Sequence, residues 1–423
     1  MAQARVANGV RPIAIEGSDF DRAIDIAVAA YTGANLFTPE ARQRFVDGLR
    51  RADRDPDVHL WGAYRDGALV GAMRLFDFSM RIHEAEGLVG GVGMVAVDLL
   101  HKKRGVARDL LGAYLAHYRE RGATMAILHP FRPDFYRRMG FGYGTKMNQY
   151  RLRPADLPHG GARERVRALG VADTDALTAC YDRVQARTNG LLRKLKGSVG
   201  ALLAAPDVRA VGYEEDGVLR GYLAFGFRDG RTSMIHELHI RELIYETPEA
   251  LAGLLAFLQS QADQFATIVF NTQDEGFHFL PADPRNGTEG VLFPPAYHET
   301  NTQGVGIMYR VLDMPGIFAL LRDHDFGGQS CTLQVTIRDS FFPPNNGVTT
   351  IRFTNGAARV TADAAHDIAI ALDVADFSSL LIGAVRFHTL LDYGLATLGD
   401  RAHARTVERL FAADRPPICT TGF

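Results

Sequence analysis

The spacing of apolar residues changes along the chain, and each change predicts an element. Apolar positions recur at helical spacing through 19–34. Residues 59–80 instead form two β-rich runs that meet at Asp66-Gly67, a dipeptide typical of a hairpin turn. An apolar run at 92–97 predicts another strand. After it, one helical stripe predicts a helix, formed by Val106, Leu110, Tyr114 and Tyr118.

Residues 1–153 complete this first pattern. Gly122 stands where the helix would end, and the runs at 124–128 and 149–152 predict two more strands. Because strands and helices alternate, this stretch predicts an α/β unit.

The pattern restarts after a polar segment at 153–165. Helical spacing at 175–188 and 249–265 alternates with strand-like runs, which lie at 208–227, 234–245 and 267–271. The order of hairpin, strand, helix and strand resembles that of the first unit, so we expect a diverged duplicate over 160–300.

A third unit follows a segment rich in proline and glycine at 279–306. Strands are expected at 331–339, 348–356 and 367–373, and helices at 377–398 and 402–411. The chain therefore predicts three domains, at 1–153, 160–300 and 305–423.

Composition and charge narrow the class of protein. With 47% hydrophobic and 23% charged residues, the chain of 423 residues has the composition of a soluble globular protein. Lysine and arginine number 47 against 49 acidic residues, a net charge of −2, which gives no support for a nucleic-acid or membrane-surface partner. The three cysteines are far apart, and no run reaches the roughly 18 apolar residues of a membrane span or has the form of a signal peptide. We expect a cytoplasmic protein with reduced thiols.

Three cations stand where the strand at 92–97 gives way to a helix, in the segment HKKRGVARDLL at 101–111. The first N–H groups of a helix lack partners within it and favour an anion such as a phosphate. A glycine there lets the backbone approach such a ligand closely. The segment is not a Walker loop, which needs GxxxxGK[ST]. Taken alone, it fits a diphosphate cradle and a surface helix with solvated cations about equally well.

Three motifs in order resemble the GNAT superfamily of acyl-CoA acetyltransferases. KKRGVA matches its Q/R-x-x-G-x-G/A motif, with Lys102 in place of Gln or Arg. Val95-Ala96-Val97 matches the V-x-V strand before that motif, and FYRRMGFGYG at 135–144 is similar to the Tyr-x-x-x-Gly-Phe element after the next strand.

The whole chain resembles one branch of that superfamily, the Eis (enhanced intracellular survival) acetyltransferases. ILH at 127–129, DFSSLLIGAVR at 376–386 and the terminal Phe423 match it further. The resemblance implies an α/β (α+β) protein with tandem GNAT-like mixed-sheet domains, the second without its phosphate motif, and a sterol-carrier-like domain. It also implies acetyl-CoA as donor, amines as acceptors, no metal and a homo-oligomer, a hexamer.

The resemblance assigns the cofactor contacts. Backbone groups of Val95, Ala96 and Val97 would bind the pantetheine arm and the thioester. The diphosphate and the adenosine phosphate would be held by Lys103, Arg104, Gly105, Val106, Ala107 and Arg108. Phe131 and Arg132 stand where the family has a Ser-Glu pair beside the cofactor, so backbone contacts are expected from them.

The chemistry needs a base and an acid, because an amine of pKa ~10.4 must lose its proton and a thiolate must depart. Tyr136 stands where the superfamily keeps its general acid; the alternative is a tyrosine packed in the core. The family's base is the terminal carboxylate, here that of Phe423. A free carboxylate of pKa ~3.5 needs burial or a relaying water for that role. The alternative is a terminus that frays, as most do.

The acceptor is left open between an aminoglycoside, a polyamine and a lysine-type amine. Eis enzymes of mycobacterial type carry an aspartate where this chain has Gly33, so one acidic contact would be missing. HELH at 236–239 does not predict a metal site, because strand positions three apart face opposite ways. The competing hypothesis is a non-catalytic protein that binds a lipid or a partner through the sterol-carrier-like domain.

Overall fold

The computed structural model describes residues 8–31, 38–52, 54–232, 235–287, 290–293 and 296–423. Gly33 lies outside them. The chain forms two compact units, described separately below. The first unit comprises Met1–Gly144, Ile307–Pro416 and Gly422–Phe423, and the second comprises Thr145–Gly306 and Pro417–Thr421.

The first unit contains a seven-stranded sheet of order β1-β2-β3-β4-β5-β16-β6. Its strands are β1 (Gly9–Pro12), β2 (Val58–Arg65), β3 (Ala68–Ile82), β4 (Ala85–Val97), β5 (Met125–Leu128), β16 (Met308–Val311) and β6 (Gly142–Tyr143). Only β4 and β5 pair in parallel; the other neighbours are antiparallel. The predicted hairpin turn is confirmed, since Asp66 and Gly67 both have positive φ, 50° and 76°.

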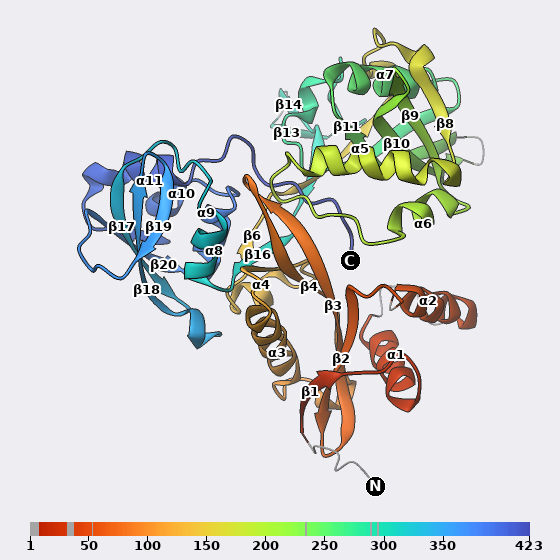
Figure 1. Cartoon of the computed structure of the whole chain (residues 1–423). Helices are drawn as coiled ribbons and strands as arrows, with labels where there is room; N and C mark the ends of the chain where they lie inside the picture. Colours follow the sequence, from red (N-terminus) through yellow and green to blue (C-terminus); the bar gives the residue numbers. More distant parts are fainter. Residues whose placement is uncertain (1–7, 32–37, 53, 233–234, 288–289, 294–295) are drawn as a thin grey trace. The chain divides into compact units, whose positions relative to one another are not determined.

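Helices cover both faces of this sheet (Figure 1). They are α1 (Ser18–Ala30), α2 (Pro39–Ala52), α3 (Val106–Glu120) and α4 (Pro133–Arg137). The predicted stripe of α3 is buried and shares one hydrophobic core with α4. A separate core lies under α1 and α2 and includes Leu60 of β2 and Ala96 of β4. The strand that leads to the cationic turn is therefore packed between two apolar layers.

The second unit repeats this sheet, in the order β15-β7-β12-β11-β10-β9-β8. Its strands are β7 (Met147–Leu152), β8 (Val166–Leu169), β9 (Arg209–Glu215), β10 (Val218–Thr232), β11 (Ile235–Tyr245), β12 (Phe265–Thr272) and β15 (Asn301–Gly304). Its helices are α5 (Thr174–Gln185), α6 (Ser198–Ala204) and α7 (Pro248–Gln259), and a small hairpin pairs β13 (Val291–Phe293) with β14 (Ala296–His298). The single parallel pair is again in the middle, β11 with β12, which confirms the predicted repeat.

Each sheet contains one strand that, by its position in the sequence, belongs with the other repeat. The strand expected at 149–152 is confirmed as part of β7, but its expected place in the first unit is wrong, because it pairs with β12 and β15 of the second sheet. The equivalent place in the first sheet, between β5 and β6, is taken by β16. The two repeats have exchanged a strand.

A third sheet, in the first unit, has the order β19-β18-β17-β20-β21. Its strands are β17 (Cys331–Arg338), β18 (Gly347–Thr354), β19 (Ala357–Thr361), β20 (Ile368–Asp373) and β21 (Ala396–Leu398). The helix expected at 377–398 is wrong: α9 (Val374–Leu381), α10 (Phe387–Asp392) and β21 replace it. Gly383 and Gly394, with φ of 82° and 70°, end the two helices.

Two further short helices belong to the same part of the chain, α8 (Met314–Leu320) and α11 (Ala404–Leu410). No helix in the described ranges has both the length and the apolar character needed to cross a bilayer.

Candidate active site

The site is built where β4 and β5 part. The two strands pair in parallel from Val89 with Met125 to Val92 with Leu128. Beyond Val92, β4 continues to Val97 and is paired, among the described residues, with β3 alone. The edge of β4 that faces away from β3 can therefore pair with an extended ligand, as with an added strand.

A bulge lies in this open part of β4. The register with β3 shifts between the pairs Arg74–Gly93 and Ala72–Ala96, and Met94 there has φ of 49°. A bulge re-aims the backbone groups next to it, and such irregularities gather at functional sites. The N–H and C=O groups of Val95 to Val97 lie in this part of the strand.

The turn after β4 is fixed by Asp98. Its carboxylate accepts hydrogen bonds from the backbone N–H of Leu100, at 2.9 Å, and from Arg22 of α1. His101 Nδ1 lies 3.0 Å from the same carboxylate, and these partners hold the pKa of Asp98 below its usual range. These hydrogen bonds hold the backbone at the position where the cationic segment begins.

The cationic turn has the backbone of an anion cradle. Lys103 and Gly105 have φ of 61° and 81°, and α3 begins directly after Gly105. Lys102, Lys103, Arg104, Gly105 and Arg108 are exposed, whereas Val106 is buried. A Cβ on Gly105 would meet no atom within 4 Å, so the space before the helix is open. The exposed cations, the left-handed residues and the helix start all fit a diphosphate.

The side chain of Tyr136 is buried and is carried by α4. Its ring lies edge-on to Phe131, Phe135 and Phe141, with centroids 6.3, 5.2 and 6.2 Å away. Burial, and next the phenol of Tyr31, raise the pKa of Tyr136 above its ordinary value. At neutral pH this side chain carries its proton, as an acid must.

Tyr31 is a residue that sequence reasoning missed. It caps the C-terminus of α1, and burial raises its pKa to about 12. Its phenol acts electrostatically on that of Tyr136, so the end of α1 lies near the predicted acid. The only sequence signal is a lone aromatic residue at the end of an amphipathic helix, which is usually a packing residue.

The last residue of the chain lies in an aromatic cage in the first unit. The ring of Phe423 is 5.4 Å from Phe76, 4.9 Å from Phe78 and 4.8 Å from His129, between centroids. Its carboxyl group lies against Gly93, where β4 leaves β5. His129 follows β5 and was noted in the sequence only as part of a family match.

The residues before Phe423 are held in the second unit. Thr145 Oγ1 donates to the carbonyl of Pro417 at 2.6 Å, and the N–H of Ile418 donates to Asn189 at 2.8 Å. The N–H of Cys419 donates to Gln273 Oε1 at 2.5 Å, and Cys419 is buried. These contacts make the tail an ordered segment, unlike the frayed end that sequence reasoning left as the alternative.

Phe131 and Arg132 lie in the loop between β5 and α4. Phe131 is 69% exposed, and Arg132 pairs with Asp134 at 2.7 Å. Their expected backbone contacts to a cofactor stay a prediction. In HELH, His239 lies 3.0 Å from Glu237. The described ranges hold no group of three or more His, Cys, Asp or Glu side chains suited to a metal ion.

Family models match three stretches of the chain. Residues 11–144 and 187–311 each match a model described as an acetyltransferase (GNAT) domain. Residues 318–420 match a sterol carrier protein domain, and this stretch is called the sterol-carrier-like domain from here on.

Several named relatives are N-acetyltransferases. One from Streptomyces coelicolor is 32% identical over 169 residues, which cover 38% of this chain and 40% of that protein. One from Streptomyces griseus is 25% identical over 86% of this chain and 88% of that protein. N-acetyltransferase Eis of Mycobacterium tuberculosis is 26% identical over 83% of this chain and 86% of that protein.

Solved structures confirm the predicted fold. A GCN5-related N-acetyltransferase from Kribbella flavida superposes with a TM-score of 0.78 at 21% identity, over the full length of both chains. Eis1 from Mycobacterium abscessus gives a TM-score of 0.74 at 19% identity, over 98% of this chain and 100% of that one. Two acetyltransferase-type domains are followed by a sterol-carrier-like domain, as the sequence predicts.

Proposed function

Because this chain is an Eis-like acyltransferase of the GNAT superfamily, we propose that it moves the acetyl group of acetyl-CoA to a primary amine by direct attack on the thioester. The observation that supports this most is the carboxyl group of Phe423 beside Gly93, at the point where β4 leaves β5. A proton acceptor there would lie next to the strand edge that is open to the pantetheine arm.

The cofactor would bind along β4 and the cationic turn. Backbone groups of Val95, Ala96 and Val97 pair with the pantetheine arm, and an N–H of this edge faces the thioester oxygen as charge develops on it. The turn from Lys103 to Arg108 holds the phosphates, and the loop at Phe131 and Arg132 flanks the cofactor. The catalytic domain expected at 1–153 takes its sheet from β1 to β6 and from β16, because β7 belongs to the second sheet.

Two groups of the chain move protons. The carboxylate of Phe423 accepts a proton from the attacking amine, directly or through a water. Tyr136 faces the departing sulfur. Its raised pKa lies above the ~8.5 of a thiol, so the phenol stabilises the thiolate first as a hydrogen-bond donor. The amide bond forms as the carbon–sulfur bond breaks. The thiolate then takes the phenol proton, coenzyme A leaves as the thiol, and the proton held by Phe423 is released to solvent, from which the phenol is reprotonated.

The acceptor is proposed by class, as an amine of an aminoglycoside, a polyamine or a lysine side chain. A cytoplasmic location and a hexameric assembly belong to the same proposal. The location follows from the separated cysteines and the apolar pattern of the sequence, and the hexamer follows from the resemblance to the Eis family.

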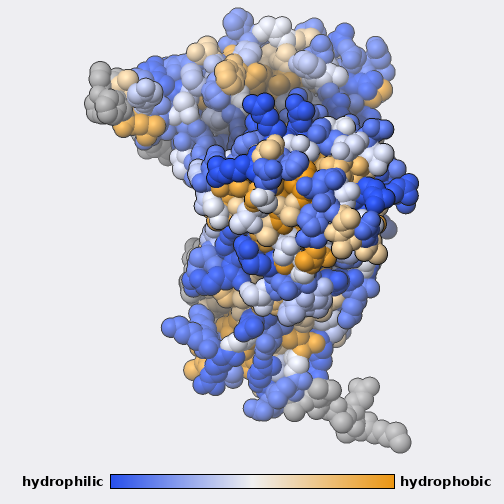
Figure 2. Space-filling model, turned by 90° about the vertical axis from the view of Figure 1, so that its left-hand side faces the viewer, coloured by the Kyte–Doolittle hydropathy of each residue, from blue (hydrophilic) through white to orange (hydrophobic). Residues whose placement is uncertain are grey.

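The competing hypothesis, a non-catalytic protein that binds a lipid or a partner through the sterol-carrier-like domain, has less support in its lipid-binding form. The sterol-carrier-like domain presents a pocket of about 460 Å³ lined by Arg386, His388, Thr389, Arg405, Glu408 and Arg409. Five of these six residues carry ionisable groups, whereas a lipid tail is bound mainly by apolar side chains. Figure 2 shows the side of the molecule on the left of Figure 1, where apolar and hydrophilic groups are interspersed.

The experiment is a thiol-release assay with acetyl-CoA and a panel of aminoglycosides, polyamines and lysine peptides. The purified chain is compared with a variant that has one alanine added after Phe423. We expect turnover with at least one amine, and a loss of about 100-fold in kcat for the extended chain. Both proteins should gain thermal stability with coenzyme A.

Each result has a distinct meaning. Full turnover of the extended chain would show that the terminal carboxylate is not the base. If no amine releases thiol and millimolar acetyl-CoA does not raise the melting temperature, the acetyl-transfer proposal is wrong.

A further inference from the structure

The helix that carries Tyr136 cannot hold its own position. α4 has five residues, and its N-cap residue, Arg132, provides no side-chain cap. Isolated helices of this length are unstable in water. The orientation of the phenol must therefore come from tertiary contacts.

One contact joins α4 to α9 of the sterol-carrier-like domain. Arg137, next to Tyr136, donates from Nη2 to Asp376 Oδ1 at 2.6 Å. The side chain of Asp376 is 8% exposed and that of Arg137 is 26% exposed. A shielded pair of this kind fixes geometry better than a surface ion pair, which solvent screens.

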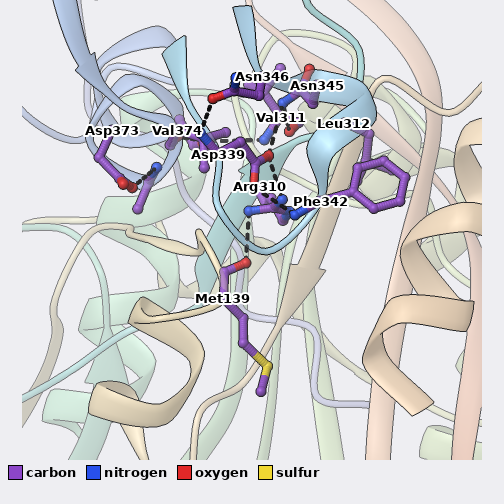
Figure 3. Close-up of polar contacts among 12 residues, drawn as sticks. Met139, Arg310, Val311, Leu312, Asp339, Phe342, Asn345, Asn346, Asp373 and Val374 are labelled. Atoms are coloured by element: carbon purple, nitrogen blue, oxygen red, sulfur yellow. Dashed lines mark hydrogen bonds and ion pairs between the residues drawn. The ribbon is translucent and has the colours of Figure 1, made fainter. Parts of the chain in front are cut away.

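A second contact holds the turn after α4 (Figure 3). Arg310 of β16 donates from Nη1 to the carbonyl of Met139 at 2.7 Å and from Nη2 to Asp339 Oδ2 at 2.6 Å. The side chains of Arg310 and Asp339 are 0% and 1% exposed. The guanidinium also lies 5.9 Å from the ring centroid of Phe141, a residue of the Tyr136 core.

Asp339 is itself held rigidly. Its Oδ1 accepts from the backbone N–H of Phe342 at 2.9 Å, and its own N–H donates to Asn346 Oδ1 at 2.9 Å. Asn345 Nδ2 bonds the carbonyl of Val311 at 3.0 Å (Figure 3). The loop after β17 and the strand that carries Arg310 thus form one bonded framework.

The turn after α4 is shaped for this framework. A Cβ on Gly140 would lie 1.5 Å from Arg310 Nη1, and one on Gly142 would lie 2.0 Å from the carbonyl of Ala375. Gly140 leaves room for Arg310 of β16, and Gly142 lets the turn approach α9 of the sterol-carrier-like domain. Within the turn, the N–H groups of Met139 and Phe141 donate to the carbonyl of Tyr136, at 2.9 and 3.2 Å.

We propose that the sterol-carrier-like domain positions the phenol of Tyr136 through two ion pairs, Asp376 with Arg137 and Asp339 with Arg310. This rests on the proposed function, in which Tyr136 is the acid. All four are positioning residues, because they act on the chain directly after Tyr136, at Arg137 and at the carbonyl of Met139. The sterol-carrier-like domain is then part of the catalytic apparatus beyond supplying the terminal carboxylate.

The test is Asp376→Asn, made alone and together with Tyr136→Phe, in the full-length chain. Loosening the pair should lower kcat about tenfold and leave the KM for acetyl-CoA within about twofold. In the Tyr136→Phe background the same change should cause no further loss, because the phenol it positions is gone. Arg137→Lys, which keeps the charge, should recover part of the activity that Arg137→Ala loses.

The matched control is Glu408→Gln in the same domain. Glu408 has a side chain 10% exposed, bonded to Arg386 and His388 and remote in sequence from α4. It should lower the melting temperature and leave kcat unchanged. If Asp376→Asn and Glu408→Gln lose kcat by the same factor, the loss comes from reduced stability and the inference is wrong.

Other outcomes also separate the proposals. If Asp376→Asn lowers kcat by the same factor with and without the phenol, positioning is wrong while the acetyl-transfer proposal stands. If Tyr136→Phe has the kcat of wild type, Tyr136 is not the acid. The proposal that the sterol-carrier-like domain positions it for that role is then wrong as well. Asp376→Asn is preferred to changes at Arg310, because an unpaired buried charge at Asp339 can prevent folding.

Discussion

A Cβ atom on Gly93 would lie 3.2 Å from the carboxyl carbon of Phe423 and 3.3 Å from its oxygen. The last residue of the chain and the middle of β4 are therefore in contact. Gly93 follows Val92, the last residue of β4 that pairs with β5, so this contact brings the carboxylate to the start of the open strand edge. A methyl group at residue 93 tests whether the contact matters for turnover.

We expect Gly93→Ala to lower kcat about 10- to 100-fold, because the carboxylate must give way by a few tenths of an ångström. The KM for acetyl-CoA should change little. Gly112→Ala is the control, since its Cβ would meet nothing within 4 Å on α3 and alanine favours a helix. Steady-state kinetics of both variants measure this effect. If Gly93→Ala has the same kcat as Gly112→Ala, the carboxylate is not used where it lies.

Tyr136→Phe should lower kcat about 10- to 1,000-fold while the fold is kept, because phenylalanine fills the same core. Burial raises the pKa of the phenol above its ordinary value of 10.0, so the wild-type acid should stay protonated throughout neutral and mildly alkaline pH. The kcat of wild type should then show no fall from loss of an acid below about pH 10. Unchanged turnover in the variant would leave Tyr136 a packing residue.

Gly105→Ala should raise the KM for acetyl-CoA about tenfold with a smaller effect on kcat. Its φ of 81° is strained for alanine, and a methyl group would stand in the open space before α3. Gly217→Ala is matched in strain, with φ of 74° in the hairpin between β9 and β10 and no atom within 4 Å. Only the first variant should weaken the stabilisation by coenzyme A in a thermal-shift titration; equal weakening would point to strain alone.

His83 makes the fold sensitive to acid. It stacks on His324 at 4.4 Å, and its Nε2 donates to the carbonyl of Leu381 at 2.6 Å. Burial, and next the charge of His324, lower the pKa of His83 to about 4, although Glu84 acts the opposite way. Between pH 6.5 and 4 the unfolded chain binds a proton that the folded chain does not, so stability present above pH 6.5 is lost as the pH falls.

The loss attributable to His83 should reach roughly 3 kcal/mol by pH 4. Urea denaturation at pH 7.0 and 4.5 measures it, and His83→Gln should have a smaller pH-dependent loss than wild type. His366→Gln, at an exposed histidine, should keep the wild-type dependence. If the free energy of unfolding of His83→Gln falls with pH as steeply as that of wild type, this assignment is wrong.

Local patterns predict local elements, and here they succeed. The stripe of α3 and the Asp66-Gly67 turn depend on neighbours in sequence, and the structure has both. The partner of β7 could not be predicted, because a strand with one buried face at 147–152 fits either sheet and its pairing is decided by β12, more than a hundred residues later. The helix expected at 377–398 fails because its apolar spacing persists through two left-handed glycines.

The site divides in the same way. The cationic turn and Tyr136 lie in motifs, and their contiguous residues suffice to propose a role. Phe423 could be proposed only from a resemblance, since nothing near the C-terminus encodes its approach to Gly93. Arg310 and Asp339 left no signal at all: an arginine in an apolar strand looks unpaired until the fold brings its carboxylate to it.

The exchange of β7 and β16 also governs how the protein can be made. A nascent chain emerging from the ribosome holds β5 and β6 long before residue 308, so the slot between them stays vacant until most of the polypeptide has been synthesised. A gene fragment that encodes only residues 1–153 would carry β7 without β12 and would present bare strand edges to its neighbours, an invitation to aggregate. Each repeat needs the other to complete its sheet, and truncation at the apparent boundary between them would leave both sheets incomplete.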